Sequence, residues 1–182
     1  QAVTIRHPEG DELQIERETA ATGDFSVASI PRGRELSFPG AANTIGSALA
    51  GLELENVEPA GTFDPGGVKP VVARFGTFDG LVVEASTWKL PAGARVRFLA
   101  SIDEALAARF ASAEAGAAGD AVPDGGDTDA GTAARKSLEE VRAEAEDLNA
   151  RSGDWVYTLP DYKVEQLTKK IADLLAPLPP TK

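Results

Sequence analysis

The sequence has no cysteine, no methionine and a single histidine among its 182 residues. Without cysteine the chain forms no disulfide, builds no thiolate metal site and uses no thiol nucleophile, which fits a reducing cytoplasm and a periplasm equally well. A translated protein starts with methionine, whereas this chain starts with Gln1. We therefore expect an excised or processed piece, with any targeting signal on an upstream segment.

Long apolar runs and a surplus of basic residues are also missing. No run of about 18 apolar residues occurs, and no apolar segment follows a basic start, so we expect neither a transmembrane helix nor a signal peptide here. The net charge is −11, from 29 acidic and 18 basic side chains. Because the lysines and arginines do not cluster, a chain of this sign repels phosphate backbones, and we expect no nucleic-acid partner.

The composition is that of an ordinary globular protein. Apolar residues make up 42% and charged residues 26% of the chain, which excludes wholesale disorder. A domain usually has roughly 100–200 residues. We therefore predict one domain over residues 1–182.

Alternating apolar residues predict several strands. Residues 3–18 carry apolar side chains at every second position on both sides of a Pro-Glu-Gly-Asp turn, which indicates a hairpin. Residues 71–75 and 81–85 alternate in the same way, and residues 95–100 supply a third strand that would stabilise this pair. Between them, Asp79-Gly80 is typical of a tight turn, because glycine and aspartate tolerate positive φ angles.

Helical spacing and capping motifs predict the helices. Residues 43–52 and 161–175 carry apolar stripes, and the pairs Ser101/Glu104 and Ser137/Glu140 have the spacing of capping boxes. Residues 113–133, rich in alanine, glycine and aspartate, bury little, so we expect a mobile acidic loop there.

One pattern occurs twice in the chain: an aromatic residue is followed by an alternating stretch, a proline and an amphipathic helix. It begins at Phe25 and again at Trp155. This echo suggests two similar strand–helix halves. The fold class that follows is α+β, a mostly antiparallel sheet with helices packed on one face, and we expect Trp155 to be buried between the two layers.

Motifs for catalysis or cofactor binding are absent. His7 has no serine or carboxylate at a recognisable spacing, which makes it a surface histidine rather than a ligand or general base. There is no nucleophile elbow and no phosphate-binding glycine loop. We therefore assign no catalytic, cofactor-binding or metal-ligating residue and expect no cofactor.

Acidic residues leave two alternatives open. Asp124, Asp127 and Asp129 offer oxygen ligands for calcium, but an EF-hand loop begun at Asp127 would have leucine where a bidentate glutamate is needed. A solvated linker is the simpler interpretation of this segment. A pair of carboxylates such as Asp79 and Glu84 could serve glycoside cleavage, although no sequence pattern selects a pair.

Three segments of the chain carry a family resemblance. They are residues 30–57, residues 74–85, which include TFDG, and residues 148–175, where the match is closest. These segments resemble the C-terminal part of a bacterial family of unknown function, the one numbered 4340 among the domains of unknown function. The resemblance implies an α+β domain that recurs in tandem behind an N-terminal membrane anchor and is encoded beside components of ABC-type transport systems. The family has no assigned active residues.

Two hypotheses about function follow. The first is a non-catalytic extracytoplasmic interaction module of a membrane-anchored protein, accessory to an ABC-type transport system at the periplasmic face of the inner membrane. Its partner would be a protein, such as a transporter subunit, and its contact with the membrane would run only through a segment absent from this chain. The second is a cell-envelope carbohydrate hydrolase or ligand-binding domain that uses acidic residues. The missing catalytic motifs favour the first.

Overall fold

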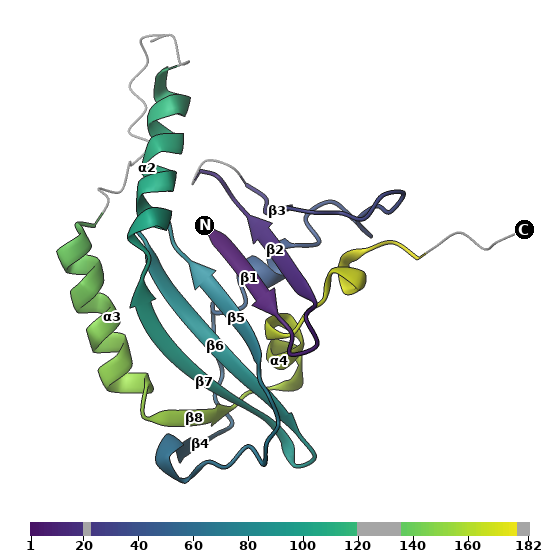
Figure 1. The fold of residues 1–182 in the computed structure, drawn as a ribbon, viewed down its shortest axis with the longest axis vertical. Helices are drawn as coiled ribbons and strands as arrows, with labels where there is room; N and C mark the ends of the chain where they lie inside the picture. The colour runs from purple at the N-terminus through teal and green to yellow at the C-terminus, as the bar shows by residue number, and fades with distance from the viewer. Residues whose placement is uncertain (20–22, 120–135, 178–182) are drawn as a thin grey trace, which may run out of the picture.

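A computed structural model of the protein describes residues 1–19, 23–119 and 136–177 (Figure 1). These residues form one eight-stranded antiparallel sheet with the strand order β3-β2-β1-β5-β6-β7-β8-β4. The predicted α+β class with a mostly antiparallel sheet is confirmed. The strands are β1 (Ala2–Arg6), β2 (Glu12–Glu16), β3 (Ser26–Val27), β4 (Asn56–Pro59), β5 (Val71–Gly76), β6 (Leu81–Leu90), β7 (Gly93–Ile102) and β8 (Trp155–Thr158). The helices are α1 (Asn43–Gly46), α2 (Glu104–Gly119), α3 (Leu138–Ser152) and α4 (Asp161–Leu167), with short 3-10 turns η1 (Ala60–Thr62) and η2 (Ile171–Leu174).

The first hairpin has the register that its sequence predicts. Val3 pairs with Ile15 and Ile5 pairs with Leu13, so the four apolar side chains share one face of the sheet. All four are buried. The polar residues between them lie on the opposite face, as expected for a sheet with one solvated side.

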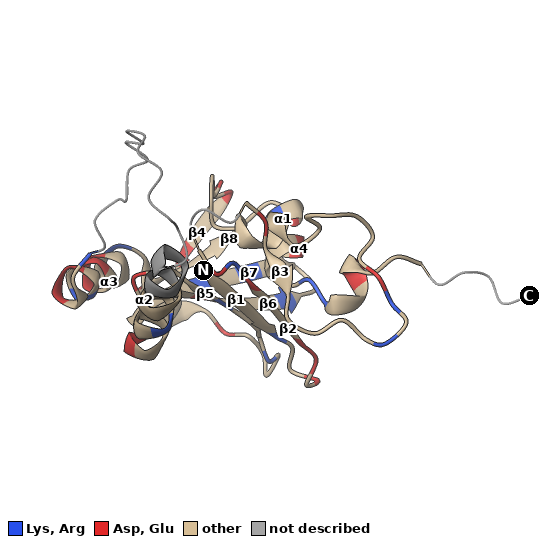
Figure 2. Cartoon of the chain, turned by 90° about the horizontal axis from the view of Figure 1, so that it is seen from above, with Lys and Arg blue, Asp and Glu red and all other residues tan. Residues whose placement is uncertain are grey.

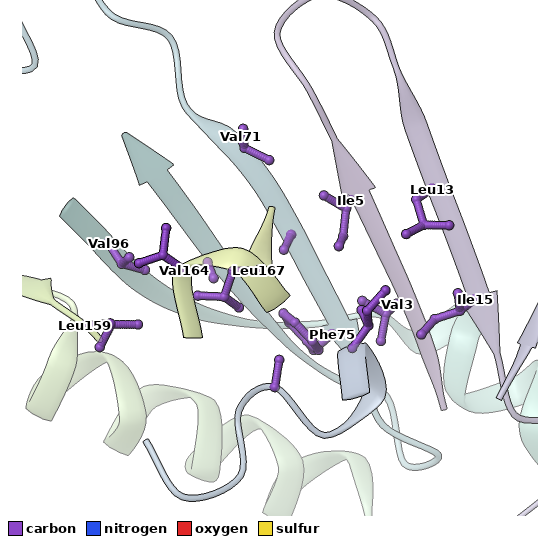
Figure 3. Close-up of a cluster of buried hydrophobic side chains, with 14 of the residues drawn as sticks. Val3, Ile5, Leu13, Ile15, Val71, Phe75, Val96, Leu159, Val164 and Leu167 are labelled. Carbon is purple, nitrogen blue, oxygen red and sulfur yellow. The ribbon is translucent and has the colours of Figure 1, made fainter. Parts of the chain in front are cut away.

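The main hydrophobic core lies between this face and the helices α1 and α4. Figure 2 shows both helices on the same side of the sheet. Ile45 of α1 and Val164 and Leu167 of α4 are buried against strand residues such as Phe75, and the close-up shows the α4 side chains pointing at the strands (Figure 3).

Helix α3 packs on the far end of the same face. Ser137 caps it with the predicted capping box, since the Ser137 hydroxyl accepts from the Glu140 N–H while the Glu140 carboxylate accepts from the Ser137 N–H. Val141 and Ala145 are buried against Leu81 of β6 and its neighbours on β7. Helix α2 differs, because it rises beyond the end of the sheet (Figure 1), with Leu106 against Gly76 of β5.

Several boundaries differ from the sequence prediction. Ser101 is not a helix cap, because β7 continues to Ile102, which pairs with Leu81. The Asp103 carboxylate instead accepts from the Leu106 N–H at 2.9 Å and caps α2. The loop predicted at 113–133 begins too early, since residues 113–119 still belong to α2. Its remaining residues lie outside the described part of the chain.

The two predicted strand–helix units are unequal. The helix predicted over 43–52 ends at Gly46, where the chain continues in turns, and the helix after Pro160 ends at Leu167 before η2. The first unit has a two-residue strand at one edge of the sheet, whereas β8 lies second from the other edge. Their helices nevertheless meet over the same core.

Trp155 contradicts the prediction that it is buried. Its exposed fraction is 39%, while Val156 and Tyr157 beside it are at 1% and 8%. Trp155 is the first residue of β8 and pairs with Pro59 on the edge strand β4. The alternation placed Trp155 on the same face of the sheet as Tyr157. It did not show that the helices covering this face do not extend over Trp155.

Candidate functional site

Asp79 and Gly80 form the turn between β5 and β6. The Thr77 N–H donates to the Leu81 carbonyl at 2.8 Å, and the Gly80 N–H donates to the Thr77 carbonyl at 3.3 Å. Gly80 has a φ of 92°, while no non-glycine residue described has a positive φ. The turn therefore needs the left-handed conformation at Gly80 only, and not at Asp79 as the sequence suggested.

The Asp79 carboxylate has a structural partner. It accepts a hydrogen bond from the Thr77 hydroxyl within the same turn. Glu84 follows on β6, next to Ala85, which is buried in the core, so alternation directs Glu84 to the opposite, polar face beside Arg74 of β5. Neither carboxylate lines the clefts described below.

His7 is buried rather than exposed, which corrects the sequence prediction. Its exposed fraction is 8%, because the segment after α4 passes over it, with the Lys169 carbonyl 3.4 Å from the His7 Nε2 atom. The His7 Nδ1 atom lies 3.8 Å from the Glu9 carboxylate. Alternation in the hairpin places His7 on the face of Ile5, and that signal could have predicted its burial.

No cluster of metal-ligating side chains occurs among residues 1–19, 23–113 and 136–177. Asp124, Asp127 and Asp129, the candidate calcium ligands, lie outside the described residues.

An apolar groove lies over the sheet between α3 and the segment that follows α1. Its volume is about 260 Å³. Its walls come from three distant parts of the chain: Leu49, Leu52 and Leu54 after α1; Val83, Phe98, Leu99, Ala100 and Tyr157 on the sheet; and Leu148 and Ser152 on α3. Leu54 is 55% exposed. Leu99 pairs with Glu84, so its side chain lies on the polar face of the sheet. The apolar side chain of Leu54 is therefore left open to solvent at the mouth of this groove.

The groove is lined by uncharged side chains, and two glutamates adjoin its leucines in the sequence. Burial raises the pKa of Tyr157, so its phenol stays neutral at neutral pH. Glu53 and Glu55 alternate with Leu52 and Leu54 and are exposed. Neither glutamate forms an ion pair with a described residue. A ligand that fits this groove is therefore apolar.

A buried lysine positions the groove segment. Lys163 of α4 is 5% exposed, and its Nζ atom donates to the carbonyls of Ala48 at 3.0 Å and Ala50 at 2.5 Å. These hydrogen bonds fix the chain on both sides of Leu49. No sequence pattern indicates this role, because a lysine at position 163 is expected on the exposed side of an amphipathic helix.

In the part of the chain that the structure describes, no helix combines the length and the apolar character that crossing a membrane requires. Comparison with known protein families, with curated proteins and with solved structures yields no match. The resemblance to the bacterial family numbered 4340 thus stays a prediction from the sequence, and the groove itself carries the functional argument.

Proposed function

We propose that this domain is a non-catalytic interaction module whose apolar groove binds a short segment of a partner protein. The observation that carries the proposal is the open groove, with Leu54 exposed at its mouth. Its volume of about 260 Å³ falls below the roughly 300–1,000 Å³ of typical small-molecule pockets. A groove of this size suits one or two apolar side chains of a peptide better than a cofactor.

Acidic residues next to the leucines of the groove suggest the chemistry of the partner segment. Glu53 and Glu55 do not line the groove but follow Leu52 and Leu54 in the sequence, and they have no ionic partners among the described residues. The chain as a whole carries a net charge of −11. The occupant is therefore a segment with apolar side chains for the groove and lysine or arginine next to them. Opposite charge at a rim mainly speeds association and sets orientation, while apolar burial supplies affinity.

The positions of the acidic residues support a binding role over hydrolysis. A glycosidase needs two carboxyl groups on either side of the bond it cleaves. Asp79 is bonded to Thr77 at the end of a hairpin, and Glu84 is on a strand with its side chain on the polar face. We therefore do not carry the carbohydrate hydrolase forward.

We extend the proposal to the cellular setting that the family resemblance implies. In that setting an upstream segment anchors the protein at the extracytoplasmic face of the inner membrane, and the groove binds a subunit of an ABC-type transport system. A photo-crosslinking residue at Leu54 of the full-length protein would then capture that subunit in cells. The same residue at Phe38, which is also 55% exposed and lies outside the groove, would not. Equal capture from both positions contradicts the setting.

Selection from a library of short random peptides tests the groove itself. We expect the selected peptides to combine apolar with basic residues. Leu54→Asp places an unpaired charge in the groove and should weaken their binding at least tenfold, about 1.4 kcal/mol. Phe38→Asp is the matched control and should leave the binding unchanged. Peptides that bind both variants as tightly as the wild type would refute the groove as the site.

A further inference from the structure

A second, polar pocket lies on the core face at the other end of the sheet. It is enclosed by the turn between β1 and β2, the segment before β5, the end of β6 and the chain after α4. Its volume is about 410 Å³, within the roughly 300–1,000 Å³ of small-molecule sites. The proposed protein-binding role of the apolar groove does not use this pocket.

The pocket has a buried hydroxyl without a partner. Thr87 of β6 lines it and is 1% exposed, and its Oγ1 atom makes no hydrogen bond with any described residue. Buried hydroxyls are nearly always hydrogen-bonded. Thr87 pairs with Val71 on one side and Val96 on the other, so a valine would serve the strand equally well. The hydroxyl is thus unexplained by the fold.

Two lysines give the pocket a spare positive charge. Lys69 and Lys89 line it and form no ion pair with a described residue. Such unneutralised cations stand out in a chain of net charge −11. Both side chains are exposed at the rim, where an ammonium group reaches a bound anion without being desolvated beforehand.

The carboxylates at the pocket are already occupied. The Lys170 ammonium lies 2.5 Å from Glu9 and 2.8 Å from Asp11, and its hydrogen bond is the main cause that lowers the pKa of Glu9. The Asp173 carboxylate accepts from the Lys170 N–H at 2.9 Å. Lys170 is therefore engaged by Glu9 and Asp11. The residues that line the pocket carry three positive charges, from Lys69, Lys89 and Lys170, against two negative ones, from Glu9 and Asp173, so the lining has a net charge of +1.

We infer that this pocket binds a small molecule with a phosphate or carboxylate group. The oxyanion lies between the ammonium groups of Lys69 and Lys89 and takes a hydrogen bond from the Thr87 hydroxyl. Phosphate and carboxylate share this chemistry, and lysine binds either as a point charge.

Calorimetric titration of the whole domain with inorganic phosphate, a sugar phosphate and succinate tests the inference. We expect at least one of the three to bind at low ionic strength and to weaken as salt is added. Tightest binding of the sugar phosphate or phosphate identifies a phosphorylated ligand, and tightest binding of succinate a carboxylate. If none binds at concentrations of about 10 mM, corresponding to roughly 2.7 kcal/mol, the inference is wrong.

Variants locate the binding. The double substitution Lys69→Gln and Lys89→Gln should raise the Kd at least tenfold. Lys169→Gln removes a neighbouring charge that does not line the pocket and should change the Kd less than twofold. Thr87→Val should raise the Kd severalfold while the melting temperature stays level or rises, because the unpaired hydroxyl is removed without changing the packing. Binding that survives both the double variant and Thr87→Val would overturn the assignment of this site.

Discussion

The side-chain amide of Asn149 forms with Ala100 the two hydrogen bonds that a neighbouring strand would form. The Ala100 N–H donates to the Asn149 Oδ1 atom at 2.7 Å, and the Asn149 Nδ2 atom donates to the Ala100 carbonyl at 2.8 Å. Strand β8 pairs with β7 only at Val96, so this part of the β7 edge would otherwise be unpaired. Helix α3 closes it, and an open edge is a liability for aggregation.

Asn149→Ala should therefore destabilise the domain by about 1–3 kcal/mol, because both backbone groups of Ala100 lose their partners. Equilibrium urea denaturation measures the change. Asn56→Ala, at an exposed asparagine of β4, is the control and should shift stability by less than about 0.5 kcal/mol. An Asn149→Ala protein as stable as this control would show that α3 does not depend on the amide for its position.

Asp79 and Gly80 differ sharply in their expected tolerance of substitution. Asp79→Asn keeps an oxygen that accepts from the Thr77 hydroxyl, so its denaturation midpoint and the function of the full-length protein should be unchanged. Gly80→Val should cost about 1–3 kcal/mol or more, because φ is 92° and a Cβ there would lie 2.8 Å from the Ala107 Cβ and the Asp103 carbonyl. A well-folded but inactive Asp79→Asn protein would instead make Asp79 a catalytic carboxylate.

Lys163→Met should both destabilise the domain and lower the affinity of the groove for its peptide. Methionine keeps the apolar stem but leaves the carbonyls of Ala48 and Ala50 without their donor, which costs about 1–3 kcal/mol for each group left unsatisfied. Urea denaturation gives the stability, and titration with a selected peptide gives the affinity. Lys136→Met, at an exposed lysine, is the control for loss of charge. If the Lys163→Met protein is destabilised but binds the peptide with unchanged affinity, Lys163 does not position the groove segment for binding.

The two aromatic residues of β8 should differ in their contribution to stability, although the sequence predicted that Trp155 is buried. Tyr157→Ala removes a ring that is 8% exposed and should cost about 3–5 kcal/mol. Trp155→Ala removes a ring that is 39% exposed and should cost about 1 kcal/mol. Chemical denaturation of the two variants shows which of the two rings is buried. A larger loss for Trp155→Ala would restore the sequence-based prediction.

Local patterns predicted the parts of the fold that local interactions determine. Val3, Ile5, Leu13 and Ile15 identify the first hairpin, because alternation and turn chemistry act over a few residues. The same capping motif is correct at Ser137 and wrong at Ser101, since only the pairing of Ile102 with Leu81 shows that β7 continues. The end of a strand depends on the strands that pair with it in space, and a local sequence motif carries no information about that pairing.

The two candidate binding sites could not be predicted in the same way. Leu54, Phe98 and Leu148 are far apart in sequence, and each one alone fits an ordinary core position. Their meeting around a groove follows from how α3 and the segment after α1 are placed on the sheet. The unpartnered hydroxyl of Thr87 likewise becomes visible only once its buried surroundings are known.

The most direct test of the proposed function is methyl-group NMR of the domain during titration with a selected apolar, basic peptide. The account predicts that the largest shift changes fall on Leu52, Leu54 and Leu148, that Val71 and Leu13 stay unperturbed, and that Leu54→Asp abolishes the changes at the same peptide concentration. Shift changes that leave these three leucines unaffected, or that persist in Leu54→Asp, would contradict it.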